Sequence, residues 1–133
     1  MNQLLMKKLL FTLLVFASIS AHADWSKTGF SDETTMFIDA KTIKKSGNLV
    51  RVTELMNLPL GAKSPDEKVS YKSSKTVEEF DCKKQTARTL RFTWYSDEMG
   101  KGKIFYKDDH SYPFEKIEPK SLIASVQRAV CPK

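Results

Sequence analysis

The chain has 133 residues, a formal net charge of +6 and 41% hydrophobic residues. A chain of this length forms one ordinary domain with room for a modest core. The positive charge is mild and is not gathered in a basic tail, which argues against a nucleic-acid-binding protein.

The first 23 residues have the organisation of a secretory signal peptide. Lys7 and Lys8 precede an apolar run over residues 9–19, and small residues stand on both sides of His22. The run is shorter than the roughly 20 residues that a membrane-spanning helix needs. We therefore predict removal of residues 1–23, export of one soluble domain over residues 24–133, and a net charge of +4 for that domain. Because position 24 is Asp and not Cys, this cleavage site predicts no lipid attachment at the mature N-terminus.

The chain contains two cysteines, Cys82 and Cys131, 49 residues apart. In an exported protein such a pair indicates a disulfide. A crosslink over this distance stabilises a fold by roughly 4 kcal/mol in the chain-entropy model. A redox-active or metal-binding pair is the alternative, but there is no Cys-x-x-Cys motif.

The first half of the mature chain predicts strands. Residues 25–30 and 34–38 are two candidate strands, residues 39–45 a helical turn, and residues 49–56 a third strand. Residues 58–68 contain Pro59, Gly61 and Pro65 and predict an exposed loop.

In the second half, residues 69–82 place their apolar side chains on both parities, which predicts a bulge or break near residues 78–79. Residues 86–95 form the clearest strand, with Leu90, Phe92 and Trp94 on one face and Thr89, Arg91 and Thr93 on the other. This alternation assigns Trp94 to the core and leaves Trp25 undecided. A hairpin loop over residues 96–102 leads into a last strand over residues 103–107.

Helical spacing begins near the C-terminus. Pro119 suits a first helical turn, and an apolar stripe formed by Leu122, Val126 and Val130 predicts a helix that ends near Cys131. The predicted fold class is α+β: an antiparallel sheet of about five or six strands, with the C-terminal helix docked on one face and tied by the Cys82–Cys131 disulfide. Both cysteines should lie on the covered side of the sheet.

The sequence offers no recognisable catalytic or metal centre. His110 follows Asp108 and Asp109, but adjacent residues rarely converge on one ion, and a solvated loop is the alternative. Glu78 and Glu79 should point to opposite faces of a strand and so form no acid/base pair. We therefore predict a protein that is not an enzyme and that uses no metal or cofactor; a hydrolase with an unrecognised catalytic set stays the competing class.

Basic residues gather around the clearest strand and its hairpin partner. If they share the solvent-exposed face of the sheet, they form a positive surface for an acidic ligand, such as a protein or an anionic glycan. An ordinary solvated face of mixed charge is the alternative. The candidate ligand-binding residues are Lys83, Lys84, Arg88, Arg91, Lys101, Lys103 and Lys107.

Short motifs in a fixed order run through nearly the whole domain. They are Trp25, Phe37-Ile38-Asp39, Thr42-Ile43, Gly47-Asn48, Phe80-Asp81-Cys82, Arg88, Tyr95-Ser96, Met99-Gly100-Lys101-Gly102, Ile117-Glu118-Pro119-Lys120-Ser121 and Cys131. In order and spacing they resemble the surface-adhesin protein E family of exported Gram-negative proteins. The chain departs from the family pattern at Phe114, where a Trp is usual.

The resemblance implies an antiparallel sheet with a C-terminal helix held by a disulfide. It also implies a non-enzymatic binding protein, because adhesin members bind host matrix or plasma glycoproteins. A periplasmic inhibitor or envelope accessory factor acting on another protein is the alternative. The expected location is the periplasm, with the cell surface or secretion as the other destinations.

Overall fold

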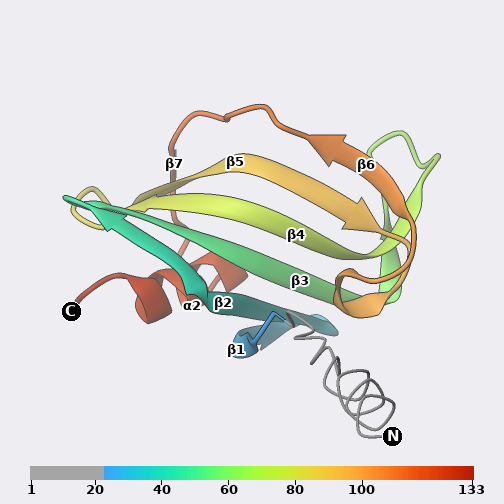
Figure 1. The fold of residues 1–133 in the computed structure, drawn as a ribbon, viewed down its shortest axis with the longest axis horizontal. Coiled ribbons are helices and arrows are strands. Elements are labelled where there is room, and N and C mark those ends of the chain that lie inside the picture. The colour runs from blue at the N-terminus through green and yellow to red at the C-terminus, as the bar shows by residue number, and fades with distance from the viewer. Residues whose placement is uncertain (1–22) are drawn as a thin grey trace, which may run out of the picture.

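The computed structural model describes residues 23–133, so the predicted signal peptide lies outside the described residues except for its last position. Six antiparallel strands follow one another across a single sheet in chain order, so each strand pairs with the next (Figure 1). A short seventh strand pairs with the start of the fifth, and one C-terminal helix lies against the sheet. The predicted α+β class, with an antiparallel sheet and a docked helix, is confirmed.

The strands are long at the centre of the sheet and short at the C-terminal edge. Their bounds are β1 Trp25–Ser31, β2 Thr34–Ser46, β3 Leu49–Lys63, β4 Ser70–Asp81, β5 Thr86–Tyr95, β6 Ile104–Asp108 and β7 Glu115–Lys116. A 3-10 turn, η1, spans Glu98–Gly100, and the helix α2 spans Leu122–Val130.

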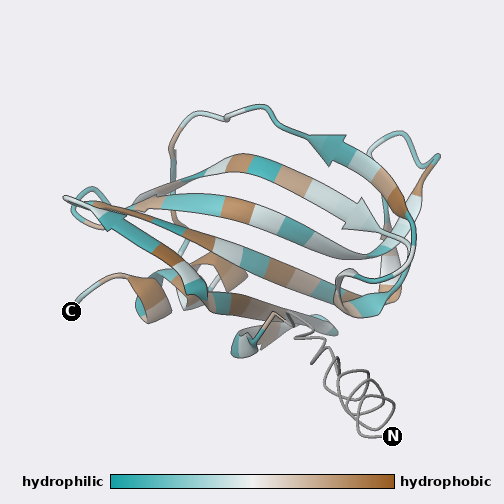
Figure 2. Ribbon diagram, viewed as in Figure 1, coloured by the Kyte–Doolittle hydropathy of each residue, from teal (hydrophilic) through white to brown (hydrophobic). Residues whose placement is uncertain are grey.

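The core lies between α2 and the N-terminal part of the sheet. Hydrophobic bands alternate with hydrophilic ones along the central strands, as a sheet with two different faces requires (Figure 2). Phe80 is fully buried at the centre of this core. The other buried members of the cluster are Met36, Ile38, Val50, Val52, Ala87, Val126 and Val130.

The helix is held at both ends. The Ser121 hydroxyl accepts a hydrogen bond from the Ala124 N–H at 3.1 Å and caps the N-terminus, so the helix begins at Leu122 and not at Pro119 as predicted. Cys131 follows the last helical residue and bonds to Cys82, with the two Cα atoms 5.6 Å apart. The predicted disulfide is confirmed, and it joins the helix to the end of β4.

The predicted helical turn over residues 39–45 is wrong, because β2 continues to Ser46. The pairing of β2 with β3 is interrupted between Asp39 and Lys44. Within this interruption the Thr42 hydroxyl accepts the Thr53 N–H at 2.8 Å and donates to the Asp39 carbonyl at 2.7 Å. A side chain therefore replaces the missing backbone partner and keeps the strand extended.

The predicted loop over residues 58–68 is too long, because β3 continues to Lys63. The pairing of β3 with β4 is suspended between Asn57 and Ala62, and β2 pairs with β3 no further than Asn57. Pro59 therefore lies where neither neighbour needs its missing N–H.

The predicted irregularity near residues 78–79 is present, but the extra residue lies on β5. Val77 pairs with Arg91 and Glu78 with Thr89, so Leu90 has no partner on β4. This bulge places Thr89 on the same face as Phe92 and Trp94, and not opposite them as predicted. Trp94 itself is half-buried and lies outside the core cluster, which corrects its assignment to the core.

Candidate functional site: the basic open face

One face of the sheet points away from α2. Along β4, Phe80 belongs to the core beneath the helix, and the alternating residues Glu79 and Val77 point to the other side. Their partners in register, Arg51 and Arg91 among them, share that side. We call this side of the sheet the open face.

Basic side chains from each of the strands β1 to β6 gather on the open face. Cross-strand pairing assigns seven basic side chains of β1 to β6 to it, and Lys116 of β7, which pairs with Thr86, as an eighth. Against them stand three acidic residues, Asp39, Glu79 and Asp81. Neighbouring strands lie about 4.8 Å apart, so these charges form one surface and not separate points. The seven are Lys27, Lys44, Arg51, Lys75, Arg88, Arg91 and Lys107.

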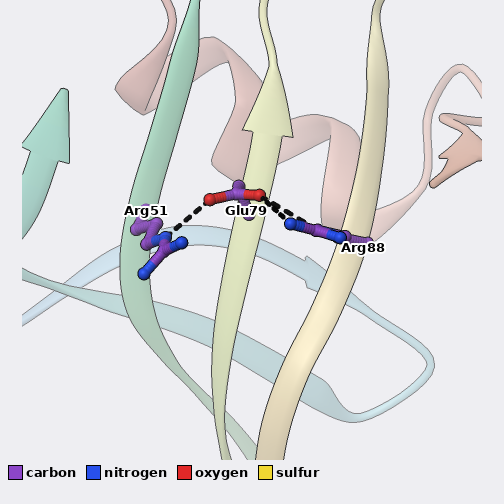
Figure 3. A network of polar contacts seen from close by, with 3 residues as sticks. All are labelled: Arg51, Glu79 and Arg88. Atoms are coloured by element: carbon purple, nitrogen blue, oxygen red, sulfur yellow. Dashed lines mark hydrogen bonds and ion pairs between the residues drawn. The ribbon is translucent and has the colours of Figure 1, made fainter. Parts of the chain in front are cut away.

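Glu79 lies between two arginines at the centre of this surface (Figure 3). Arg51 Nε lies 2.5 Å from Glu79 Oε2, and Arg88 donates to Glu79 Oε1 from Nε at 3.0 Å and from Nη2 at 2.7 Å. Burial raises the pKa of the Glu79 carboxyl, but the hydrogen bonds from Arg51 and Arg88 outweigh it and lower the pKa below its usual value. The three residues together keep one net positive charge on the face.

Arg88, one of the predicted ligand-binding residues, is already engaged on two sides. Besides Glu79, its guanidinium carbon lies 4.6 Å from the centre of the Phe114 ring. The exposed side chain of Arg91, three positions along β5, has no ion-pair partner among the described residues. Arg91 is therefore better placed than Arg88 to contact a ligand.

A groove of about 350 Å³ is hollowed into the open face beside the β5 bulge. Leu90 and Val77 contribute apolar lining, and the basic lining comes from Lys41, Lys44, Arg51 and Arg91. Lys41 also pairs with Asp24 at 3.0 Å, but both side chains are well exposed, so water weakens this pair. The groove can hold an anionic group between several cations.

The remaining predicted ligand-binding residues lie at the ends of the face. Lys83 and Lys84 occupy the β4–β5 turn, where their backbone N–H groups bind the Asp81 carboxylate. Lys101 and Lys103 lie in the β5–β6 loop, which packs on β4 through Ser73: its hydroxyl donates to the Asp97 carbonyl at 2.6 Å and accepts the Gly100 N–H at 2.8 Å. All four lysines are exposed.

Sequence reasoning missed Lys27, Lys44, Arg51 and Lys75 as members of this surface. Each stands on a strand other than β5 and β6, and only the cross-strand register shows that it shares a face with Arg91. The alternation of Val50 and Val52 with Arg51 was the available signal, because it places Arg51 opposite the core.

Two buried carboxyl groups, those of Glu54 and Glu78, lie on the helix side of the sheet, and the burial of Glu54 was not predicted. Glu54 is 3% exposed and its Oε2 atom has no hydrogen-bond partner. Burial and then the nearby Glu78 raise the pKa of Glu54 well above its usual value. Burial likewise raises the pKa of Glu78 to about 7, against a hydrogen bond from Thr89 that lowers it. Glu78 and Glu79 thus point to opposite faces, as predicted.

His110 lies in the exposed loop after β6. Its backbone N–H donates to the Asp108 carboxylate at 2.7 Å, and the Tyr112 hydroxyl donates to the same carboxylate at 2.6 Å. Over residues 23–133 no three His, Cys, Asp or Glu side chains are grouped so as to hold a metal ion. In the same part of the chain no helix is long and apolar enough to cross a membrane.

Comparison with known proteins gives one family and one fold. A family profile described as Surface-adhesin protein E matches residues 25–132. No curated protein matches the sequence.

Solved structures of Haemophilus influenzae protein E share the fold. One has a TM-score of 0.58 at 16% identity and covers 78% of this chain and 91% of that chain. A second has a TM-score of 0.56 at 16% identity, with coverages of 78% and 87%. Protein E from non-typeable Haemophilus influenzae has a TM-score of 0.55 at 13% identity, with coverages of 85% and 78%.

Proposed function

The chain belongs to the surface-adhesin protein E family, and from this premise we propose that residues 24–133 form an exported, non-enzymatic domain that binds acidic glycoproteins through its basic open face. The observation that carries the proposal is the collection of basic side chains on one face of the sheet. Three of them, Lys44, Arg51 and Arg91, line a groove together with Lys41, and the lining contains no acidic residue. Long-range attraction to an acidic partner speeds encounter and favours the correct orientation.

The contact residues in this proposal are Lys44, Arg51 and Arg91 at the groove, with Lys107 on β6 farther along the same face. Arg88 supports the surface by fixing Glu79 rather than by direct contact. Lys83, Lys84, Lys101 and Lys103 extend the positive surface at its two ends. Because these contacts are exposed, each contributes roughly 0.2–1 kcal/mol, and affinity depends on several acting together.

The experiment measures binding of the full chain, exported and processed by its Gram-negative host, to immobilised matrix glycoproteins. We expect affinity to fall as salt is raised, because the Debye length shortens from about 10 Å at 0.1 M to about 3 Å at 1 M. The double variant Lys44→Gln with Arg91→Gln should raise Kd by about tenfold, as two exposed contacts predict.

The matched control is the double variant Lys63→Gln with Lys68→Gln. It removes the same charge at the β3–β4 loop, away from the groove. Equal losses in both double variants would show that net charge alone drives capture and would refute a site on the open face. Undiminished binding in the groove variant would refute it as well.

We propose the periplasm as the compartment to which the signal peptide expected over residues 1–23 delivers the domain; a glycoprotein outside the cell is then bound only by protein that passes the outer membrane. Protease added to intact cells should then leave the protein whole, and permeabilising the outer membrane should expose it to cleavage. Degradation in intact cells would instead place the open face at the cell surface.

A further inference from the structure

A second concave site lies on the other face of the sheet. Phe92 and Trp94 pair with Thr76 and Ser74, which alternate with the open-face residues of β4 and so point to the helix side. The helix contacts β1 and β2 and leaves this end of the sheet uncovered. Here β5, β6 and the β3–β4 loop, at the right of Figure 1, enclose a pocket of about 450 Å³.

The walls of this aromatic pocket are built from rings. Trp94 lies against Tyr71, with ring centres 4.3 Å apart and planes 3° from parallel. Tyr106 lies 5.2 Å from Trp94 and 5.8 Å from Phe92, tilted by about 40° to both. Tyr71 thus supports Trp94 from one side, and the tilted rings of Phe92 and Tyr106 form a concave wall with it.

Two carboxylates stand at the rim, Asp66 from the β3–β4 loop and Asp108 from β6. Asp66 accepts hydrogen bonds from the Ser64 hydroxyl at 2.5 Å and the Lys68 N–H at 3.1 Å. Asp108 accepts from Tyr112 and His110. These bonds fix both side chains and lower the pKa of both carboxyls, so both are charged at neutral pH.

The lining of the pocket contains these two acids and no Lys, Arg or His among the described residues. The rest of the domain is basic, so this site is a local exception in charge as well as in composition. Aromatic faces attract cations through the negative face of the ring, and ionised carboxylates add charge-assisted hydrogen bonds. An anion would meet like charge here, and a neutral apolar group would leave the carboxylates unused.

We infer that the aromatic pocket binds an organic cation, an alkylammonium or guanidinium group seated among Phe92, Trp94 and Tyr106 and held by Asp66 and Asp108. The volume is in the range of sites for small molecules and single side chains. Two sources present this chemistry: a free small cation, and a lysine or arginine side chain of a partner protein.

Trp94 reports on its own occupancy. The chain has two tryptophans, Trp25 and Trp94, so in the Trp25→Phe background all tryptophan fluorescence comes from Trp94. Saturable quenching of this fluorescence then measures binding in the pocket. The probes are choline, N-acetyl-lysine amide and N-acetyl-arginine amide, each titrated into the processed full chain at constant ionic strength. The neutral isostere 3,3-dimethylbutan-1-ol is the control for choline.

We expect at least one of the three cations to bind. If choline binds, 3,3-dimethylbutan-1-ol should bind at least about fivefold more weakly than choline. Choline binding alone identifies a free cation as the ligand, and binding of the amides identifies a partner's side chain. Asp66→Asn keeps the hydrogen-bond acceptor but removes the charge, so it should weaken binding by about fivefold, the upper end for an exposed ion pair. Asp32→Asn, in the β1–β2 turn at the far edge of the sheet, should leave binding unchanged.

The inference is overturned if none of the cations quenches Trp94 saturably, or if the isostere binds as well as choline. It is also overturned if Asp66→Asn and Asp32→Asn behave alike while near-UV circular dichroism shows both variants folded. These outcomes do not bear on glycoprotein capture, which depends on the opposite face.

Discussion

Glu79 is 1% exposed, yet its neighbours favour its charged form. A buried carboxylate is costly unless it is paired and hydrogen-bonded, and Arg51 and Arg88 supply both conditions from the two adjacent strands. The same arrangement brings two guanidinium groups close together. Without the carboxylate they would repel each other across β4, so one acidic residue makes a dense basic surface tolerable.

We expect Glu79→Gln to destabilise the domain by about 2–4 kcal/mol, because it removes two charge-assisted interactions from a buried group. Chemical denaturation at pH 7 measures the change. Asp39→Asn removes an acid from the same face at a half-buried position with no ion pair among the described residues, so it should cost far less. Equal effects of the two substitutions would contradict the assigned role of Glu79.

Glu54 and Glu78 reduce the stability of the fold at neutral pH, whereas Glu79 increases it. Their folded-state pKa values are raised, so the folded protein holds protons that the unfolded chain releases above about pH 4.5. Stability should therefore fall as pH rises from about 4.5 through 7. Glu79, whose pKa is lowered, contributes stability above the unfolded pKa and loses it as pH falls toward the folded pKa. Together they predict greatest stability near pH 4–5.

The substitution Glu78→Gln tests this balance. It should raise the unfolding free energy at pH 7 by on the order of 2 kcal/mol, because the charged form no longer has to be buried. It should also flatten the decline between pH 4.5 and 7, measured by denaturation at several pH values. A decline as steep as that of the wild type would show that other groups set the pH dependence.

At the scale of elements, hydrophobic periodicity predicted the strand bounds where one strand presents two contrasting faces. The bounds of β5, residues 86–95, follow from alternation alone. The hairpin after it was predicted from the glycines Gly100 and Gly102, and the irregularity near residue 78 from the break in apolar parity. Prediction failed at residues 39–45, where the pairing of β2 with β3 is interrupted, and at residues 58–63, where Pro59 and Gly61 lie in a stretch that pairs with no neighbour. Whether a residue needs its N–H depends on the adjacent strand, which sequence does not display.

The candidate site shows the same limit. Arg88, Arg91 and Lys107 were named as candidates for one basic face because they lie on one hairpin, with an ordinary solvated face of mixed charge as the alternative. Lys44, Arg51 and Lys75 join them only through the order and register of the other strands. The aromatic pocket was missed because Phe92 and Trp94 do lie on the helix side, as predicted, but a nine-residue helix does not reach them.

The disulfide compensates for this short helix. Nine residues are too few for a helix that is stable in water, so α2 depends on packing and on the bond from Cys131 to Cys82. Replacing either cysteine by Ser should lower the unfolding free energy by roughly 2–5 kcal/mol. Amide hydrogen exchange should show α2 losing protection before the central strands. Uniform loss across the domain would mean that the helix and the sheet unfold as one unit with or without the bond.

At the scale of the whole molecule, the sheet separates two surfaces of opposite charge. The open face is basic and the aromatic pocket is acidic, and one layer of strands lies between them. The groove and the pocket share no lining residue, and Arg91 and Phe92, which are neighbours on β5, point to opposite faces. The sheet therefore allows the domain to hold an acidic partner on one face and a cationic group on the other.

We accordingly expect the two binding activities to be independent. Lys44→Gln with Arg91→Gln should weaken glycoprotein capture and leave the Trp94 titration by cations unchanged, and Asp66→Asn should do the reverse. The combined variant should lose both by the product of the separate factors, because charges on opposite faces are screened from each other at physiological salt. Each activity can be measured in the same preparation, capture by surface binding and occupancy by fluorescence. A loss of cation binding in the open-face variant would mean that the sheet transmits a change between its faces, and would make the groove and the pocket parts of one coupled site.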